Sequence, residues 1–158
     1  MLQLQAKYRL LAAPDLRAIL KQIAGDGRLV GAHQFENDPD KALIAVTGRD
    51  WTKIGILYNG TDTQCHWNVA KLFRSGIIDG IVIGYAHNFQ GWHQHTWGLK
   101  GRSLVETTTD NKINDHWFGA RLGPKRTKIF VDRCMANPPG GGMIRTMRGG
   151  PLDPKTPT

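Results

Sequence analysis

Apolar residues recur along the chain with two different periods, and each period predicts a different kind of element. Three segments show helical spacing: residues 14–24, residues 38–47 and a segment that begins near residue 65. The first has the clearest stripe, at i, i+3, i+4 and i+7, made by Leu16, Ile19, Leu20 and Ile23. Asp15 suits the positive end of this helix and Gly25 suits its stop. Asp38 is the expected cap of the second helix, which runs through Ala42, Leu43 and Val46.

The third helix carries the first candidate for chemistry. Asp62 or Thr63 can cap it, and Ser75-Gly76 ends it. Cys65 then lies in the first turn, where unpaired backbone N–H groups and the helix dipole favour an anion. A thiolate is such an anion, so this position favours a reactive cysteine.

After this helix the pattern changes to that of strands. Residues 77–86 are apolar on both faces and predict a buried central strand, followed by a loop over 87–91. Residues 94–99 and 102–107 predict a hairpin with a tight turn at Lys100-Gly101. The run of β-branched and aromatic residues over 127–131 predicts one more strand.

The hairpin places an imidazole beside a carboxylate. His95 and Glu106 are each about five residues from the turn, so antiparallel pairing sets them opposite each other or nearly so. Opposed side chains on one face can hydrogen-bond, whereas a shift of one residue would send them to opposite faces. Together with Cys65 they form an ordered set of thiol, imidazole and carboxylate. Such a set lets a thiol attack an amide or thioester while the histidine carries the proton.

These residues resemble the core of the transglutaminase-like branch of the papain-like cysteine hydrolases, including small bacterial and phage proteins with the same pattern. The shared features are a cysteine at a helix start, Gly84-Tyr85, His95-Thr96-Trp97, and the acidic Glu106 followed by Thr107-Thr108. They cover about residues 58–109. The resemblance implies an α+β fold in which the catalytic helix packs on an antiparallel sheet. It also implies a cysteine peptidase or amidase, a deamidase or a transglutaminase-like acyl transferase, with no cofactor.

The resemblance further implies roles for individual residues. Cys65 is the expected nucleophile, His95 the base and acid, and Glu106 the group that orients the imidazole. The backbone N–H of Cys65 is one expected oxyanion donor, and Asn59, preferred over Gln64, is the second. Substrate contacts are expected from Trp92 at the rim of the site, His93 and Trp97.

Several alternatives remain open at this point. His93 lies two residues from His95 and points the same way on a strand, so it competes for the role of base. Cys65, His93 and His95 could also bind zinc, with His87, His116 or Glu106 as a fourth ligand. His66 points about 100° around the helix from Cys65, which favours a position on the rim or surface. His87 and His116 are expected to be structural or solvated, and Cys134 a passive thiol.

Length and charge set the wider frame. The 158 residues predict one domain over 1–136, with an N-terminal helical part (1–57), a catalytic core (58–132) and a Gly/Pro-rich tail (137–158). The net charge is +8, and residues 121–158 carry +6 of it, from eight basic and two acidic residues. That segment suits nucleic acid or an acidic protein partner, so the rival interpretation is a binding protein.

Two cysteines are too few for a disulfide framework, and no apolar run is long enough to span a membrane. We therefore expect a cytoplasmic protein that acts on a protein or peptide substrate, while the oligomeric state stays open.

Overall fold

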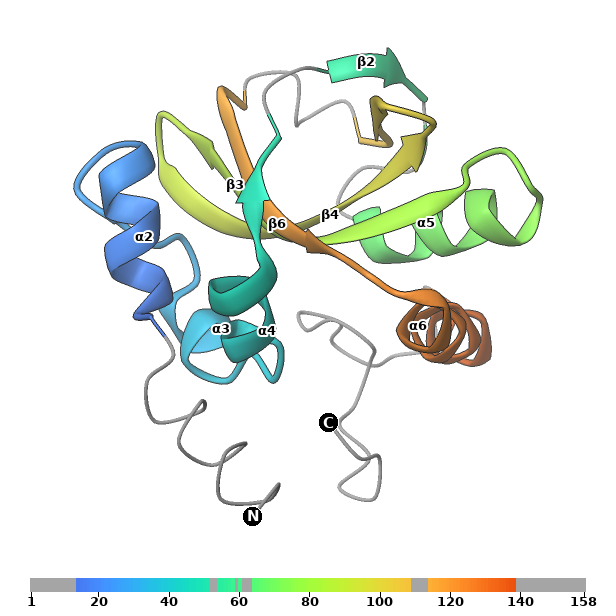
Figure 1. Cartoon of the computed structure of the whole chain (residues 1–158), viewed down its shortest axis with the longest axis horizontal. Helices are drawn as coiled ribbons and strands as arrows, with labels where there is room; N and C mark the ends of the chain where they lie inside the picture. Colours follow the sequence, from blue (N-terminus) through green and yellow to red (C-terminus); the bar gives the residue numbers. More distant parts are fainter. Residues whose placement is uncertain (1–13, 52–53, 59, 61–63, 109–113, 139–158) are drawn as a thin grey trace.

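A six-stranded sheet and five helices make up the part of the chain that the structure describes, residues 14–51, 54–58, 60, 64–108 and 114–138 of a computed structural model (Figure 1). The strand order is β1-β6-β3-β4-β5-β2, and every neighbouring pair is antiparallel except β2 and β5. The helices are α2 (Leu16–Ile23), α3 (Ala32–Glu36), α4 (Lys41–Thr47), α5 (Cys65–Arg74) and α6 (Pro124–Ala136). The strands are β1 (Arg49–Asp50), β2 (Ile54–Leu57), β3 (Gly80–Asn88), β4 (Gly91–Lys100), β5 (Ser103–Glu106) and β6 (His116–Arg121). The prediction of a mixed α+β protein is confirmed.

Of the three helices before β1, α2 and α4 form close to where the apolar pattern predicts them, while α3 was not predicted. Asp15 caps α2, and its Oδ1 accepts a hydrogen bond from the Arg17 N–H at 3.1 Å. The cap of α4 is Asp40 and not Asp38, whose Oδ1 instead accepts from the Asp40 N–H at 2.9 Å in the turn before the helix. The face that α4 buries holds Ile44, while Val46 is exposed.

The connection between β1 and β2 shows that the sheet is strongly curled. These strands lie at opposite edges of the sheet, yet only residues 51–53 separate them in sequence. Because a chain extends by at most about 3.5 Å per residue, the two edges lie within about 15 Å of each other. The sheet therefore encloses one of its faces, and the helices cover the other (Figure 1).

A pair of glycines permits this curvature. Gly84 of β3 and Gly119 of β6 are direct partners across the ladder. A methyl group on Gly84 would lie 2.1 Å from the Phe118 carbonyl oxygen, and one on Gly119 would lie 2.8 Å from the Trp97 ring. Glycine lets the two strands approach and bend where any side chain would hold them apart.

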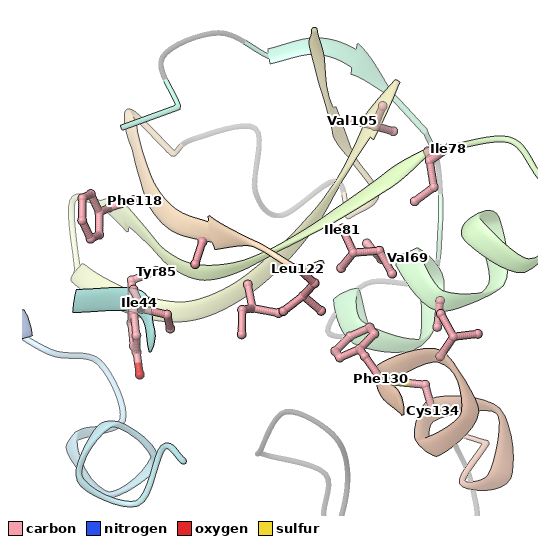
Figure 2. Close-up of a cluster of buried hydrophobic side chains, with 14 of the residues drawn as sticks. Ile44, Val69, Ile78, Ile81, Tyr85, Val105, Phe118, Leu122, Phe130 and Cys134 are labelled. Carbon is pink, nitrogen blue, oxygen red and sulfur yellow. The ribbon is translucent and has the colours of Figure 1, made fainter. Parts of the chain in front are cut away.

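Each face of the sheet has its own hydrophobic core. The helix-covered face contributes alternate residues such as Ile81, Tyr85 and Phe118, which pack with the buried sides of α4, α5 and α6 (Figure 2). The enclosed face holds a second cluster, rich in tryptophan: Trp51, Val82, Ala86, Trp97, Leu99, Leu104 and Trp117. Trp51 lies between β1 and β2 in sequence, and its Nε1–H donates to the Gly119 carbonyl at 3.0 Å. The candidate site is built on this enclosed face.

Several sequence predictions need correction. The strand predicted over 127–131 is wrong, because these residues lie inside α6. Their apolar positions continue as Thr127, Phe130, Val131 and Cys134, which is the i, i+3, i+4, i+7 spacing of a helix. The loop predicted over 87–91 is a tight connection, since β3 runs to Asn88 and β4 starts at Gly91. The turn of the next hairpin lies at Gly101-Arg102, one residue later than predicted.

The predicted domain parts also differ from the structure. The region 1–57 is not only helical, because it supplies β1 and β2, the two edges of the sheet. Of the predicted tail, residues 139–158 lie outside the described part of the chain. Within the described residues, no helix combines the length and the apolar character needed to cross a lipid bilayer.

The glycine pair provides a test of the curled sheet. Gly84→Ala should lower the free energy of unfolding by about 1–3 kcal/mol, because the new methyl group meets the backbone of β6. Gly123→Ala is the matched control, since a methyl group there meets nothing within 4 Å and its φ of −71° suits any residue. Urea unfolding of both variants measures the difference. Equal stability of the two would contradict the close approach of β3 and β6.

Candidate active site

Glu106, the last residue of β5, is a carboxylate with no exposure to solvent. Its Oε1 lies 2.6 Å from His95 Nε2, and its Oε2 accepts a hydrogen bond from the Trp117 Nε1–H at 3.0 Å. A buried charge is tolerated only when it is paired and hydrogen-bonded, and here each oxygen has a partner. The three side chains come from β5, β4 and β6 and converge on the enclosed face of the sheet.

The pairing of His95 with Glu106 was predicted, but the strand register differs from the prediction. Gly98 faces Val105 and Leu99 faces Leu104, so Trp97 and not His95 corresponds to the position opposite Glu106. The register is displaced by two residues. A displacement of two keeps both side chains on the same face, and diagonal neighbours remain within reach of long side chains. The contact therefore forms despite the wrong register.

Cys65 reaches His95 from the other side. It is the first residue of α5 and is half-buried, and it lies close enough to His95 for each group to shift the pKa of the other. Because Nε2 of His95 is occupied by Glu106, the remaining ring nitrogen, Nδ1, is the one that serves the sulfur. The helix end fits here because the ladder between β4 and β5 ends at Gly98 and leaves the edge of β4 open at residues 95 and 96. The structure thus brings all three predicted residues together.

Backbone hydrogen bonds tie the segment before Cys65 to the strand that carries Glu106. The Tyr58 N–H donates to the Glu106 carbonyl at 2.7 Å, and the Gly60 N–H donates to the Thr107 carbonyl at 2.8 Å. A methyl group on Gly60 would lie 2.5 Å from the Asn68 amide and 2.6 Å from the Thr107 carbonyl, so this close contact requires glycine. The positions of the sulfur and of the carboxylate are therefore fixed by one set of contacts.

The two ionisable groups at the centre of the site have pKa values shifted in opposite directions. Burial lowers the pKa of His95, but the charges of Glu106 and Cys65 and its hydrogen bonds to both outweigh burial and raise the pKa to about 10. Burial raises the pKa of Cys65, but the charges of His66 and His95 and hydrogen bonds from both hold it well below the usual value. A thiolate beside an imidazolium follows, and that pair is the nucleophilic form of such a site.

His66 was expected at the rim or surface, and the structure adds side-chain contacts that this expectation did not include. Its ring is half-buried, with Nδ1 at 2.6 Å from Thr96 Oγ1 and at 3.8 Å from the Cys65 sulfur. Its opposite edge packs against Phe130 of α6, with the ring centres 6.2 Å apart. Sequence reasoning missed it because neighbouring helical residues point about 100° apart. Here the helix end straddles the edge of β4, so Cys65 meets His95 on one face while His66 meets Thr96 on the other.

The predicted substrate contacts are less well placed. Trp92 is not at a rim: it is fully buried, and its Nε1–H donates to the Ala24 carbonyl at 3.1 Å. Trp97 is also fully buried and stacks on His95 with ring centres 5.9 Å apart, so it supports the imidazole rather than facing solvent. His93 is half-buried, and its ring centre lies 5.8 Å from that of His95. Of the two histidines, His95 is the one paired with Glu106.

The predicted oxyanion donors can be placed only in part. Asn59 lies outside the described residues. Gln64 immediately precedes α5, and its side chain does not cap the helix. The first N–H groups of any helix have no partner within that helix, and in α5 these include the N–H of Cys65, the other expected donor.

The alternative of a zinc site was predicted around Cys65, His93 and His95. In the described part of the chain, no three His, Cys, Asp or Glu side chains are grouped so that they could hold a metal ion. His87 instead pairs with Asp115 through Nδ1 at 2.7 Å, and His116 packs against the His87 ring. These two histidines have the structural role that was expected. Cys134 is buried in the helix-covered core, as expected of a passive thiol.

Replacing Trp117 tests how tightly Glu106 is held. Trp117→Phe removes a hydrogen bond to a buried charge and should cost about 1.5–3 kcal/mol of unfolding free energy. Trp51→Phe is the control: its indole N–H is bonded at the same 3.0 Å, but to the neutral Gly119 carbonyl, so about 0.5–1.5 kcal/mol is expected. Denaturant titration gives both values. A loss no larger for Trp117 than for Trp51 would contradict a charged Glu106.

Removing the thiol should change how stability depends on pH. The raised pKa of His95 stabilises the fold fully below about pH 6.5, and this contribution is lost as the pH rises toward about 10. The lowered pKa of Cys65 stabilises the fold fully above about pH 8.5, and its contribution is lost as the pH falls. Between these limits the two oppose each other. Cys65→Ala leaves only His95, whose proton Glu106 still holds, so stability should fall more steeply with rising pH than in the wild type.

Urea unfolding at three pH values across this window measures the slope. Cys134→Ala is the matched control, because it removes a buried thiol that lies in the helix-covered core and leaves the Cys65–His95 pair intact. It should follow the wild-type slope. If Cys65→Ala also followed it, the thiolate–imidazolium pair would be ruled out.

The chain was compared with protein-family models, curated proteins and solved structures, and none of them matches it.

Proposed function

We propose that this protein is a thiol-dependent amide hydrolase or acyl transferase in which Cys65, His95 and Glu106 form a catalytic triad. One observation carries the proposal. A half-buried cysteine at the start of a helix has its pKa lowered by a histidine whose Nε2 lies 2.6 Å from a fully buried carboxylate. Three separate elements, α5, β4 and β5, supply these groups, and the order of roles is that of a nucleophile, a base and an orienting acid.

The chemistry follows from the protonation states. The Cys65 thiolate attacks the carbonyl carbon of an amide and forms a carbon–sulfur bond. When the carbon–nitrogen bond breaks, His95 gives its proton to the departing amine. Water or a second amine then attacks the thioester and passes a proton to His95, and the Cys65 thiolate leaves. Glu106 stays charged throughout and holds the imidazole with Nδ1 toward the sulfur.

The negative oxygen that forms during attack needs hydrogen-bond donors. The unpaired N–H groups in the first turn of α5 are the donors closest to the sulfur in sequence, and the helix dipole favours negative charge there. No acidic side chain lies in that turn to compete for them. This supports a site in which the helix start both activates the thiol and stabilises the oxyanion.

The arrangement of α5 on the sheet is compatible with the transglutaminase-like and papain-like resemblance, in which a cysteine-bearing helix packs on a largely antiparallel sheet. On this proposal the substrate is a protein or peptide, and no cofactor takes part in the reaction. A reducing compartment such as the cytoplasm suits a reactive thiol and a second free cysteine.

The rival interpretation, a protein that binds nucleic acid or an acidic partner, stays a prediction. This interpretation depends on the basic C-terminal segment. The structure describes one helix of that segment, α6, and its exposed residues include Lys125, Arg126 and Lys128. Lys128 already pairs with Asp132 at 2.6 Å. The rest of the basic segment lies outside the described residues, so the triad is the better supported basis for function.

An activated ester tests the chemistry without knowledge of the natural substrate. With p-nitrophenyl acetate, the wild type should release a burst of about one p-nitrophenol per protein and then turn over steadily as the acyl-enzyme hydrolyses. Cys65→Ala should show neither phase. His95→Gln should lose at least about 100-fold in the steady rate, because general acid–base help of that size is removed.

Two matched variants make the result specific. Cys134→Ala keeps the candidate nucleophile and should stay close to the wild type, whereas His93→Gln keeps the His95–Glu106 pair and should lose far less than His95→Gln. A burst that survives in Cys65→Ala, or a loss in His93→Gln equal to that in His95→Gln, would refute the assignment.

A further inference from the structure

His66 contacts the same sulfur as His95, and the proposed triad gives it no role. Its Nδ1 lies 3.8 Å from the Cys65 sulfur and 2.6 Å from the Thr96 hydroxyl. The ring is wedged between β4 and α6, where Phe130 packs against it edge to face. Both sides of the ring are therefore held, and the nitrogen that faces the sulfur is fixed in direction.

A count of charges shows what this second imidazole can do. With the thiol ionised, Cys65 and Glu106 each contribute one negative charge and His95 contributes one positive charge. The three together carry one excess negative charge, in a site where His95 and Glu106 are 1% and 0% exposed. Excess charge in such surroundings is costly unless another group offsets it. Because Glu106 is charged and already pairs with His95, the positive charge of His95 does not also balance the negative charge of the thiolate.

We propose that His66 is a second imidazole partner of the Cys65 sulfur and supplies the positive charge that the thiolate, His95 and Glu106 together lack. The two histidines then have different roles. His95, fixed by Glu106, carries protons to and from the substrate, while His66 keeps the sulfur ionised before it attacks the substrate and after it leaves the thioester. His66 is a positioning residue in this scheme, because it acts through Cys65. The inference rests on the proposed function for its catalytic meaning, but the thiolate itself can be measured without any substrate.

The surroundings of His66 support this assignment. On its own helix the titratable neighbour is Cys65, and through it the ring is coupled to His95 and Glu106. From β4 it meets the hydroxyl of Thr96, and from α6 it meets the aromatic ring of Phe130. The charge of His66 is also the largest of the effects that lower the Cys65 pKa. These contacts direct the charge of His66 to the sulfur.

The test is the pH dependence of alkylation of Cys65 by iodoacetamide, in full-length protein that carries Cys134→Ala so that one thiol reacts. In this background the rate should reach half its maximum well below pH 8.5, the usual value for a free cysteine. His66→Phe keeps a ring to pack on Phe130 but removes the nitrogens. It should reduce the rate at pH 6 at least about tenfold, the effect of one pKa unit on the thiolate fraction.

Two comparisons separate charge from packing. His33→Phe removes an exposed imidazole of α3 and should leave the profile unchanged. In His95→Gln the thiol should still ionise below pH 8.5. In the double variant His95→Gln/His66→Phe, alkylation of Cys65 should follow the pH profile of an ordinary cysteine. If His66→Phe reduces the folded fraction, as judged by circular dichroism, His66→Asn gives the same reading, because its short side chain cannot reach the sulfur.

The outcomes are distinct. A folded His66 variant with the profile of the background overturns the role of His66 and leaves the triad standing. A background protein that itself ionises near pH 8.5 overturns both the proposed function and this inference. A raised midpoint in His66→Phe with an unchanged His33→Phe supports the inference.

Discussion

A carboxylate shut away from solvent is the constraint on which the rest of this site depends. Glu106 can remain charged only because His95 and Trp117 each satisfy one of its oxygens, at 2.6 and 3.0 Å. Those partners come from two strands that flank β3, so the carboxylate links three parts of the sheet. Its charge fixes which nitrogen of His95 is left for Cys65 and raises the pKa of that histidine to about 10. The buried pair of His95 and Glu106 is therefore the centre of the candidate site.

The curled sheet makes that ion pair possible. Gly84 and Gly119 let β3 and β6 approach closely, and the enclosed face that results brings Trp97 against His95 and Trp117 against Glu106. The early end of the β4–β5 ladder then leaves an open edge on β4 for the start of α5. The histidine and the acid are buried on the enclosed face, while Cys65 at the start of α5 stays half-buried. Burial of the charged pair and exposure of the thiol would conflict at a single residue. Here they belong to different residues.

Local patterns in the sequence predicted much of this arrangement, and physics explains where they succeeded. The amphipathic stripe of α2 and the first-turn position of Cys65 depend only on residues within one or two turns. The meeting of His95 with Glu106 was predicted from a register that proved two residues off. It formed because parity, and not the exact partner, decides which face a strand residue occupies. A contact predicted from the alternation of strand residues therefore survives a register error of two residues, but it would have failed with an error of one.

The features that were missed share a different cause. Apart from Lys128, residues 127–131 are β-branched or aromatic, and over five residues a buried helix and a strand can have the same composition. Only the extension of the apolar spacing to Cys134 separates them. Trp117 and His66 were missed because their roles depend on contacts between segments with no local signal. Trp117 belongs to β6, a strand that no prediction included, and His66 depends on the open edge of β4. The predicted triad carries one excess negative charge when its thiol and its acid are both ionised, and on the inference above His66 offsets that charge.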